Sequence, residues 1–343
     1  MVFQVLSHFV KQSFFLPKPG LTENNLPDQS GRVFIITGGY AGVGYQLCQI
    51  LYSRNGTIYV AGRSKGKANS AIARIQEGDP SSKGRLEFLE LDLGDLTTIK
   101  PAAEMFLSKE SRLDVLCQLP DCKPDVPSPD NAGVMFPPIG STSTQGHEMQ
   151  MATNCLGHFL LARLLTPILE RTASAAAPGT VRIAWAASFG VDALSPKGGV
   201  SLDKNGGFEA HESNNQVNYG ATKAGNLFLA SQFAKRVPIP ADGKGVVNVA
   251  FNPGNLRTEL QRHSGKFEVW VVDKLLLHPA ILGAYTELWC GWSEDVKPGS
   301  NGGYAWPWGR FGPVRDDVQA ELGNSGKAEA FWEWCAKETK AFA

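Results

Sequence analysis

Six short runs of mostly apolar residues recur along the chain from residue 33 onwards, with helical sequence between most of them. Continuous apolar runs are typical of strands buried on both faces of a sheet, because a sheet with one wet face would alternate apolar and polar residues. The runs are 33–37, 57–61, 86–91, 113–116, 180–185 and 246–251. Strands that alternate with helices predict an α/β fold with one doubly wound parallel sheet and helices on both faces.

A glycine-rich turn follows the first run. Gly38, Gly42 and Gly44 lie between that run and a helical stretch that starts near residue 45. Glycines at this spacing let backbone N–H groups approach a pyrophosphate at a helix N-terminus, where the helix dipole favours an anion. The turn therefore predicts a Rossmann-type nucleotide site, a tight turn without a ligand being the alternative. The residues expected to line it are Gly38, Tyr40, Ala41, Gly42, Val43 and Gly44.

The residues after the second run indicate which nucleotide is bound. An acidic residue there would bind the ribose 2′-hydroxyl of NAD, whereas an arginine accommodates the 2′-phosphate of NADP. This chain has Arg63, followed by Ser64, Lys65 and Lys67 as further donors. Arginine can bind phosphate through two N–H groups at once. We therefore expect NADP(H), with Arg63 and Lys67 as contacts; an ordinary solvated loop is the alternative.

Tyr219 and Lys223 form a candidate catalytic pair. They lie four positions apart in a helical stretch, so they share one helix face. A positive charge near a phenol favours the phenolate and lowers its pKa, which lets a tyrosine exchange a proton near neutral pH. Such pairs also arise by chance on helices, and the pair gains weight from the nucleotide turn upstream.

Charge and cysteine content limit the classes of partner. The chain has 343 residues, with 33 basic and 33 acidic side chains, so no overall field attracts nucleic acid or an anionic membrane. The six cysteines form no Cys-x-x-Cys pair and no zinc spacing, so we expect no metal site. Without a secretory signature they are expected to be reduced thiols, and the protein to be cytoplasmic.

Residues 1–29 are expected to form a separate N-terminal segment, amphipathic over its first 16 residues. Its apolar face would consist of Val2, Phe3, Val5, Leu6, Phe9, Val10 and Phe14. The segment is too short and too interrupted to span a bilayer, and it lacks the features of a signal peptide. Docking on the body of the protein and peripheral contact with a membrane are both compatible with the pattern.

Taken together, these motifs resemble the classical short-chain dehydrogenase/reductases, and particularly fungal members related to retinol dehydrogenases. The resemblance covers roughly residues 30–310, and 30–343 is expected to form one domain. It rests on the turn that begins at Thr37, on Pro253-Gly254, and on Asp92, Asn131-Ala132-Gly133, Asn154, Ser188, Tyr219 and Lys223. Many such relatives serve secondary-metabolite pathways.

The resemblance implies a role for each matching residue. Tyr219 would exchange the proton, Lys223 would lower its pKa and hold the nicotinamide ribose, and Ser188 would bind the substrate oxygen. Asn154 would hold a water that links Lys223 to solvent. The remaining cofactor contacts would be Asp92, Leu93, Asn131, Ala132, Gly133, Pro253, Gly254 and Thr258. Taken alone, Asn154 is better explained as a residue that caps or bridges helices, and Ser188 as a turn residue.

One segment departs from the family pattern. Residues 117–130 contain four prolines, which exclude a central strand, and they separate the fourth run from Asn131. We interpret them as a loop foreign to the fold. Deleting such an insert should raise stability and activity, and loss of NADPH binding on deletion would refute this interpretation.

The segment after Pro253-Gly254 bears on the substrate. Substrate-side elements are expected at 256–310, where 256–278 is apolar and partly aromatic, as in a lid over a lipophilic substrate or in a core helix. Residues 302–309 are expected to cover the same side of the sheet. The prediction is an NADP(H)-dependent carbonyl reductase or alcohol dehydrogenase, monomeric or homodimeric. The alternative is an NADP-binding sensor or scaffold whose site the insert impairs.

Overall fold

A single eight-stranded sheet organises the chain in the computed structural model, which describes residues 2–119, 136–256, 277–323 and 326–343. The strand order is β3-β2-β1-β4-β5-β6-β7-β8, and every neighbouring pair is parallel except β7 with β8. The strands are β1 Val33–Thr37, β2 Thr57–Gly62, β3 Arg85–Glu90, β4 Val115–Gln118, β5 Val181–Ala186, β6 Val246–Phe251, β7 Gly303–Trp306 and β8 Arg310–Phe311. The predicted α/β fold is confirmed. Its strand order reverses direction between β1 and β4, where ligands bind in such sheets.

The sequence-based boundaries were wrong in the fourth strand. Cys117 and Gln118 had been placed in the proline-rich loop, but they continue β4 and pair with Ala184 and Trp185 of β5. Leu119 is also buried, and its carbonyl accepts a hydrogen bond of 2.6 Å from the Thr37 hydroxyl. The prolines lie further on, so they do not interrupt the strand. Residues 120–130, which carry the rest of the proposed insert, lie outside the described residues.

Part of the region expected on the substrate side belongs to the framework instead. Helix α10 (Ala280–Trp292) packs against α2 and β5, and β7 pairs in parallel with β6. The segment expected to cover the sheet at 302–309 thus supplies a seventh strand and the turn into β8. The candidate lid at 257–276 lies outside the described residues.

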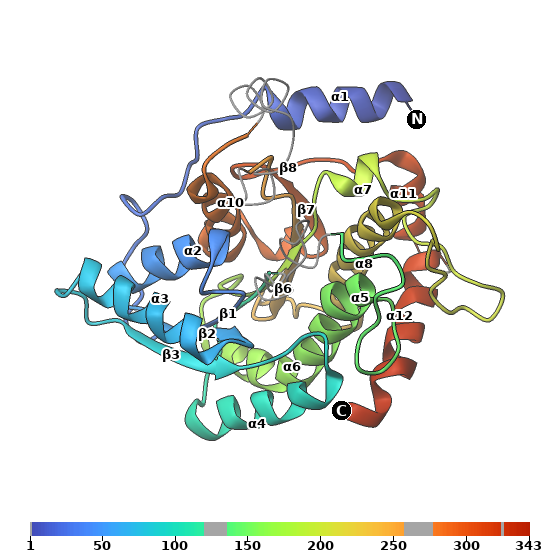
Figure 1. The fold of residues 1–343 in the computed structure, drawn as a ribbon. Helices are drawn as coiled ribbons and strands as arrows, with labels where there is room; N and C mark the ends of the chain where they lie inside the picture. Colours follow the sequence, from blue (N-terminus) through green and yellow to red (C-terminus); the bar gives the residue numbers. More distant parts are fainter. Residues whose placement is uncertain (1, 120–135, 257–276, 324–325) are drawn as a thin grey trace.

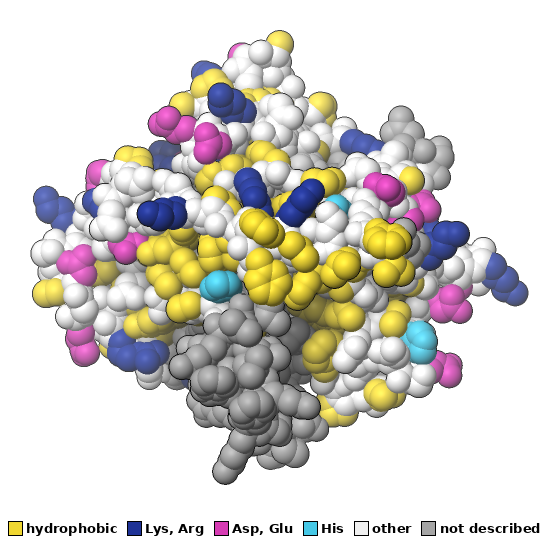
Figure 2. Space-filling model, turned by 90° about the horizontal axis from the view of Figure 1, so that it is seen from above, with side chains coloured by type: hydrophobic (Ala, Val, Ile, Leu, Met, Phe, Trp, Pro, Cys, Tyr) yellow, Lys and Arg dark blue, Asp and Glu magenta, His cyan; other side chains and the backbone are white. Residues whose placement is uncertain are grey.

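Helix α1 (Val2–Ser13) lies on the body of the protein, next to α7 and β8 (Figure 1). Docking is confirmed, but the docked face is the polar one: His8, Gln12 and Ser13 are buried, whereas Phe3 is 89% exposed. Figure 2, a view onto this end of the molecule, shows hydrophobic side chains gathered on the surface. A domain boundary at residue 29 stays a prediction.

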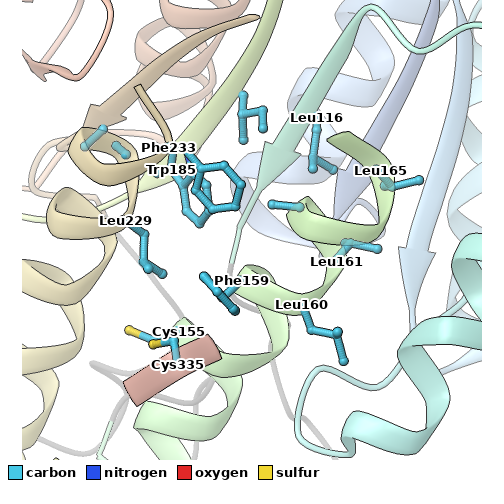
Figure 3. Close-up of a cluster of buried hydrophobic side chains, with 14 of the residues drawn as sticks. Leu116, Cys155, Phe159, Leu160, Leu161, Leu165, Trp185, Leu229, Phe233 and Cys335 are labelled. Atoms are coloured by element: carbon cyan, nitrogen blue, oxygen red, sulfur yellow. The ribbon is translucent and has the colours of Figure 1, made fainter. Parts of the chain in front are cut away.

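Two hydrophobic clusters cover the two faces of the sheet. One joins the sheet to α4, α6, α8 and α12, and the ring of Phe233 there contacts both Trp185 of β5 and Phe159 (Figure 3). The other joins it to α2, α3 and α10. The remaining helices are α2 Gly42–Ser53, α3 Lys65–Gly78, α4 Ile99–Lys109, α5 Met149–Met151, α6 Gly157–Ala175, α7 Gly190–Ala193, α8 Asn215–Arg236, α11 Asp316–Glu321 and α12 Lys327–Thr339, with a π-helical segment at Ala152–Leu156.

The run from α5 through the π-helical segment to α6 is the one candidate membrane span in the described part of the chain. Residues Met149–Ala175 are long and apolar enough to cross a bilayer by length and composition, but 78% of their apolar window is buried inside the protein. A core helix of an α/β protein meets the same criteria, because both of its sides contact apolar neighbours. The burial favours the core helix.

Candidate active site at the carboxyl edge of the sheet

The predicted nucleotide turn joins β1 to α2. Gly38 and Gly42 have φ angles of +62° and +50°, the left-handed region that glycine adopts most readily. Gly44 is required for another reason, because a Cβ there would lie 2.6 Å from the carbonyl oxygen of Gly38. Ala41, the residue before α2, provides no side-chain cap. The first N–H groups of α2 are therefore left for an external acceptor.

Tyr40 has a structural role that the sequence did not suggest. A Cβ at Gly62 would lie 2.3 Å from Cε1 of Tyr40, so the buried ring packs directly on the end of β2. Ala41 and Val43 complete the turn at the start of α2. The ring of Tyr40 thus fixes the turn relative to the strand that carries the next group of candidates.

The end of β2 collects basic residues at a helix N-terminus. Ser64 caps α3 by accepting a hydrogen bond from the Lys67 backbone N–H, and Nε of Arg63 lies 3.9 Å from Oδ1 of Asp92. The first turn of α3 carries no acidic residue, although the helix dipole favours anions there. Arg63 and Asp92 therefore meet at this edge, and Lys67 lies in the first turn of α3, close to Arg63 in the sequence. Leu93 differs, because its side chain is buried in the core cluster.

Ser188, Tyr219 and Lys223 meet where β5 and α8 approach each other. The Ser188 hydroxyl accepts a 3.1 Å hydrogen bond from the Gly190 N–H and is also bonded to the Tyr219 phenol. Nζ of Lys223 lies 5.4 Å from the centre of the Tyr219 ring. It donates a 3.0 Å hydrogen bond to the carbonyl of Ala186, at the end of β5. Tyr219 and Lys223 thus lie on one face of α8, as their spacing in the sequence predicted.

The electrostatics of the pair differ from the sequence-based expectation. Burial raises the pKa of Tyr219, and the hydrogen bond from Ser188 opposes that change only in part. The pKa of Lys223 is lowered to about 8, because its ammonium is also removed from water. The expectation that Lys223 lowers the pKa of Tyr219 was therefore wrong for this structure. Desolvation is the largest influence on both groups.

Asn154 lies within the π-helical segment that joins α5 to α6. Its Nδ2 donates a 3.1 Å hydrogen bond to the Thr222 hydroxyl, next to Lys223 along α8. Its Oδ1 is buried and has no partner among the residues that the structure describes. Buried acceptors are rarely left unpaired, and π-helical turns often occur at functional sites. The orphan oxygen fits a bound water, which the sequence analysis predicted here.

Three residues near Tyr219 were missed from the sequence. A Cβ at Gly190 would lie 3.1 Å from Cε1 of Tyr219, so glycine provides room for the phenol. Tyr304 of β7 donates a 3.1 Å hydrogen bond to the Ser188 carbonyl. The ring of Phe136 lies 5.4 Å from that of Tyr219. Neither β7 nor the position of Phe136 could be read from a local pattern.

Pro253 and Gly254 follow β6 at the same edge. Gly254 has a φ angle of +94°, and its N–H donates to the Asn252 side chain at 3.0 Å. The remaining candidates, Asn131, Ala132, Gly133 and Thr258, lie outside the described residues. Within the described part of the chain, no cluster of three His, Cys, Asp or Glu residues could hold a metal ion.

Comparison with known proteins places this site in a family. A family model for short chain dehydrogenase matches residues 32–181. A short-chain dehydrogenase/reductase of Pestalotiopsis fici is 41% identical over 335 residues, which are 96% of this chain and 97% of the relative. The chain belongs to the short-chain dehydrogenase/reductase family. It is therefore an oxidoreductase of the type that uses a nicotinamide cofactor, in agreement with the resemblance found from the sequence.

Solved structures of low sequence identity agree with the fold of this short-chain dehydrogenase/reductase. A protein from Mycobacterium paratuberculosis is 24% identical, with a TM-score of 0.63 that covers 94% of this chain and 98% of the other. Pseudomonas aeruginosa RhlG, solved as an NADP active-site complex, is 20% identical. Its TM-score is 0.56, and the match covers 82% of this chain and 95% of RhlG.

Proposed function

We propose that this enzyme is an NADP(H)-dependent oxidoreductase that interconverts a carbonyl and an alcohol on a lipophilic small molecule. The observation that carries the proposal is the convergence of Ser188, Tyr219 and Lys223 at the carboxyl edge of the sheet, where Nζ of Lys223 lies 5.4 Å from the centre of the Tyr219 ring. The likeness to fungal relatives supports a place in fungal secondary metabolism.

The turn and the end of β2 fit a dinucleotide phosphate. The close approach of Gly44 to Gly38 leaves no room for a side chain, and the N-terminus of α2 lacks a side-chain cap. Arg63 and Lys67 would hold the 2′-phosphate, and Lys223 the nicotinamide ribose. When bound, the nicotinamide would supply or accept the hydride. The anion site at the start of α2 and the basic residues after β2 support NADP(H) as the cofactor.

The phenol of Tyr219 would donate the proton in the direction of reduction. At neutral pH its phenol stays protonated, and Ser188 would hold the substrate oxygen that receives the proton. Lys223, with a pKa of about 8, is mainly an ammonium at pH 7, which suits the contact with the nicotinamide ribose proposed for it. A water on Oδ1 of Asn154 would then return the proton from solvent.

The surroundings of the phenol favour an apolar substrate. The rings of Phe136 and Tyr219 are 5.4 Å apart, and Phe189 follows Ser188 directly. Aromatic side chains around a few polar groups are typical of pockets for lipophilic ligands.

Cofactor binding and turnover test the proposal separately. NADPH and NADH would each be titrated by fluorescence, and oxidation of NADPH would be followed with a panel of aromatic and polyketide-like ketones. We expect tighter binding of NADPH than of NADH, and turnover of at least one ketone. Tight NADPH binding without turnover across the panel would favour the sensor or scaffold, and absent binding would refute both.

A further inference from the structure

The orientation of α1 reverses the usual arrangement of an amphipathic helix. Its fully buried residues are all polar, whereas much of its apolar side, including Phe3 and Leu6, is exposed; Phe9 is half-buried against Phe189. A helix that packs on a soluble body normally buries its apolar side, because burial of apolar surface is the main stabilising effect. The outward apolar face therefore needs an explanation beyond the stability of this chain.

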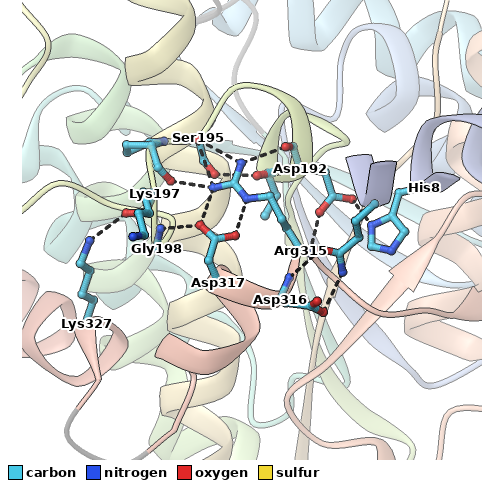
Figure 4. Close-up of polar contacts among 12 residues, drawn as sticks. His8, Asp192, Ser195, Lys197, Gly198, Arg315, Asp316, Asp317 and Lys327 are labelled. Atoms are coloured by element: carbon cyan, nitrogen blue, oxygen red, sulfur yellow. Dashed lines mark hydrogen bonds and ion pairs between the residues drawn. The ribbon is translucent and has the colours of Figure 1, made fainter. Parts of the chain in front are cut away.

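Specific hydrogen bonds fix this orientation. His8 lies 2.9 Å from the carboxylate of Asp192 in α7, and Figure 4 shows Asp192 between His8 and Arg315. Asn252 donates to the Gln12 side chain at 2.9 Å, and Asn255 donates to the Ser13 hydroxyl at 2.9 Å. Buried polar groups lose these partners if the helix turns over, at a cost for each group. Rotation that would bury the apolar side is therefore opposed.

A second set of contacts holds the two ends of α1. The Gln4 side chain donates to Asp316 at 2.7 Å and accepts from its backbone N–H at 3.2 Å. Arg310 donates to the carbonyls of Lys11 and Phe15, at 2.6 and 2.9 Å. The helix is thus anchored along its whole length by its polar side.

The outward face concentrates the exposed apolar surface of the described chain. Large hydrophobic side chains are exposed at eight described positions, and five of them belong to this one segment. These five are Val2, Phe3, Leu6, Phe14 and Phe15, with exposed fractions of 80, 89, 57, 53 and 68%. A contiguous apolar surface of this kind marks an interaction site.

The charge of the segment indicates what covers this face. Residues 2–22 contain Lys11 and Lys18 and no aspartate or glutamate. Lysines beside an apolar helix face suit an anionic lipid surface, where the apolar side chains enter the headgroup boundary. A second copy of this chain would instead bring lysines of the same sign together, which is unfavourable.

We propose that α1 and the residues directly after it bind the surface of an anionic lipid bilayer through Phe3, Leu6, Phe14 and Phe15, with Lys11 and Lys18 at the headgroups. The buried side of the helix contacts both loops of the candidate site. Asp192 follows Ser188 by four residues, and Asn252 and Asn255 enclose Pro253-Gly254. Membrane binding therefore places the active-site edge of the sheet next to the bilayer. The binding itself does not depend on the proposed reaction.

Vesicle flotation of the full-length chain tests this proposal. The vesicles would consist of phosphatidylcholine, with or without phosphatidylserine. We expect the wild type to float with the phosphatidylserine vesicles and Phe3→Ser/Leu6→Ser to lose about tenfold or more in affinity. Leu107→Ser, which changes an exposed leucine on α4, is the matched control and should float like the wild type. Lys11→Gln/Lys18→Gln should lose the preference for phosphatidylserine.

Two results would overturn the proposal. One is the absence of wild-type flotation, or flotation that Phe3→Ser/Leu6→Ser leaves unchanged. The other is a wild-type dimer in light scattering that becomes monomeric in Phe3→Ser/Leu6→Ser, which would assign the face to a second copy. Thermal unfolding of each variant checks that the fold is intact, since both substituted side chains are exposed.

Discussion

Glu287 makes the stability of this protein depend on pH in a way that can be calculated. The residue lies on α10 and is fully buried. Apart from a hydrogen bond with the Cys117 thiol, neither carboxyl oxygen has a partner in the described chain. Burial raises the pKa of Glu287 from its ordinary 4.5 to about 8. At neutral pH the folded protein therefore holds a proton that the unfolded chain releases.

The sign and size of the effect follow from proton linkage. Below pH 4.5 the carboxyl is protonated in both states and contributes nothing. Between pH 4.5 and about 8 only the folded state binds the proton, so the free energy of unfolding falls by about 1.4 kcal/mol per pH unit. At pH 8 the total loss is on the order of 5 kcal/mol, and it stays constant above that.

Urea unfolding from pH 5 to pH 8 measures this loss. Glu287→Met, an apolar replacement of similar length, should lack the slope and should exceed the wild type by several kcal/mol at pH 8. Glu287→Gln should also lack the slope, since it cannot ionise. Burial lowers the pKa of His158 to about 4, so this residue also makes stability depend on pH. Its contribution is the same in the wild type and both variants, and it cancels when their free energies of unfolding are subtracted. A difference between Glu287→Gln and the wild type that does not change with pH would refute the reasoning.

Three further substitutions test other parts of the account. Gly190→Ala should reduce kcat about tenfold without changing NADPH affinity, because the new methyl group displaces Tyr219; equal kcat in steady-state assays would contradict this. Arg63→Ser should weaken NADPH binding about tenfold or more and leave NADH binding nearly unchanged in fluorescence titrations, and an equal loss for both would remove Arg63 from the 2′-phosphate site. Arg182 donates hydrogen bonds to the carbonyls of Gly179, Cys290, Ser293 and Val296. Arg182→Met should therefore lower the free energy of unfolding by about 3 kcal/mol or more. A change under about 1 kcal/mol in urea unfolding would be inconsistent with that role.

The parts of the fold that depend on local pattern could be predicted from the sequence. The five apolar runs other than the fourth match their strands to within one residue, because buried parallel strands need continuous apolar sequence. The glycine turn and the Tyr219–Lys223 pair are equally local. Each depends on a short spacing that the chain itself defines.

The parts that were missed depend on distant contacts. β7 is recognisable only by its pairing with β6, because its glycine- and tryptophan-rich sequence resembles a loop. The position of Tyr304 over Ser188 follows from that pairing. Prolines downstream concealed the end of β4.

Helix α1 shows a different limit of sequence analysis. The amphipathic pattern located the helix, but the pattern cannot say which side contacts the protein. That was decided by polar partners such as Asp192 and Asn252, more than a hundred residues away in the chain. The pKa of Tyr219 was missed for a similar reason, because helix spacing gives its distance from Lys223 but not its burial.

The role of Tyr219 is tested most directly by Tyr219→Phe at saturating NADPH, with a ketone that the wild type reduces. Tyr285→Phe, which removes from α10 a phenol hydroxyl that donates a hydrogen bond to Glu23, is the matched control. We expect Tyr219→Phe to bind NADPH as the wild type does and to lose reduction at least a hundredfold, as for removal of a general acid, while Tyr285→Phe keeps it. Reduction by Tyr219→Phe at the wild-type rate would contradict the assignment of this phenol as the proton donor.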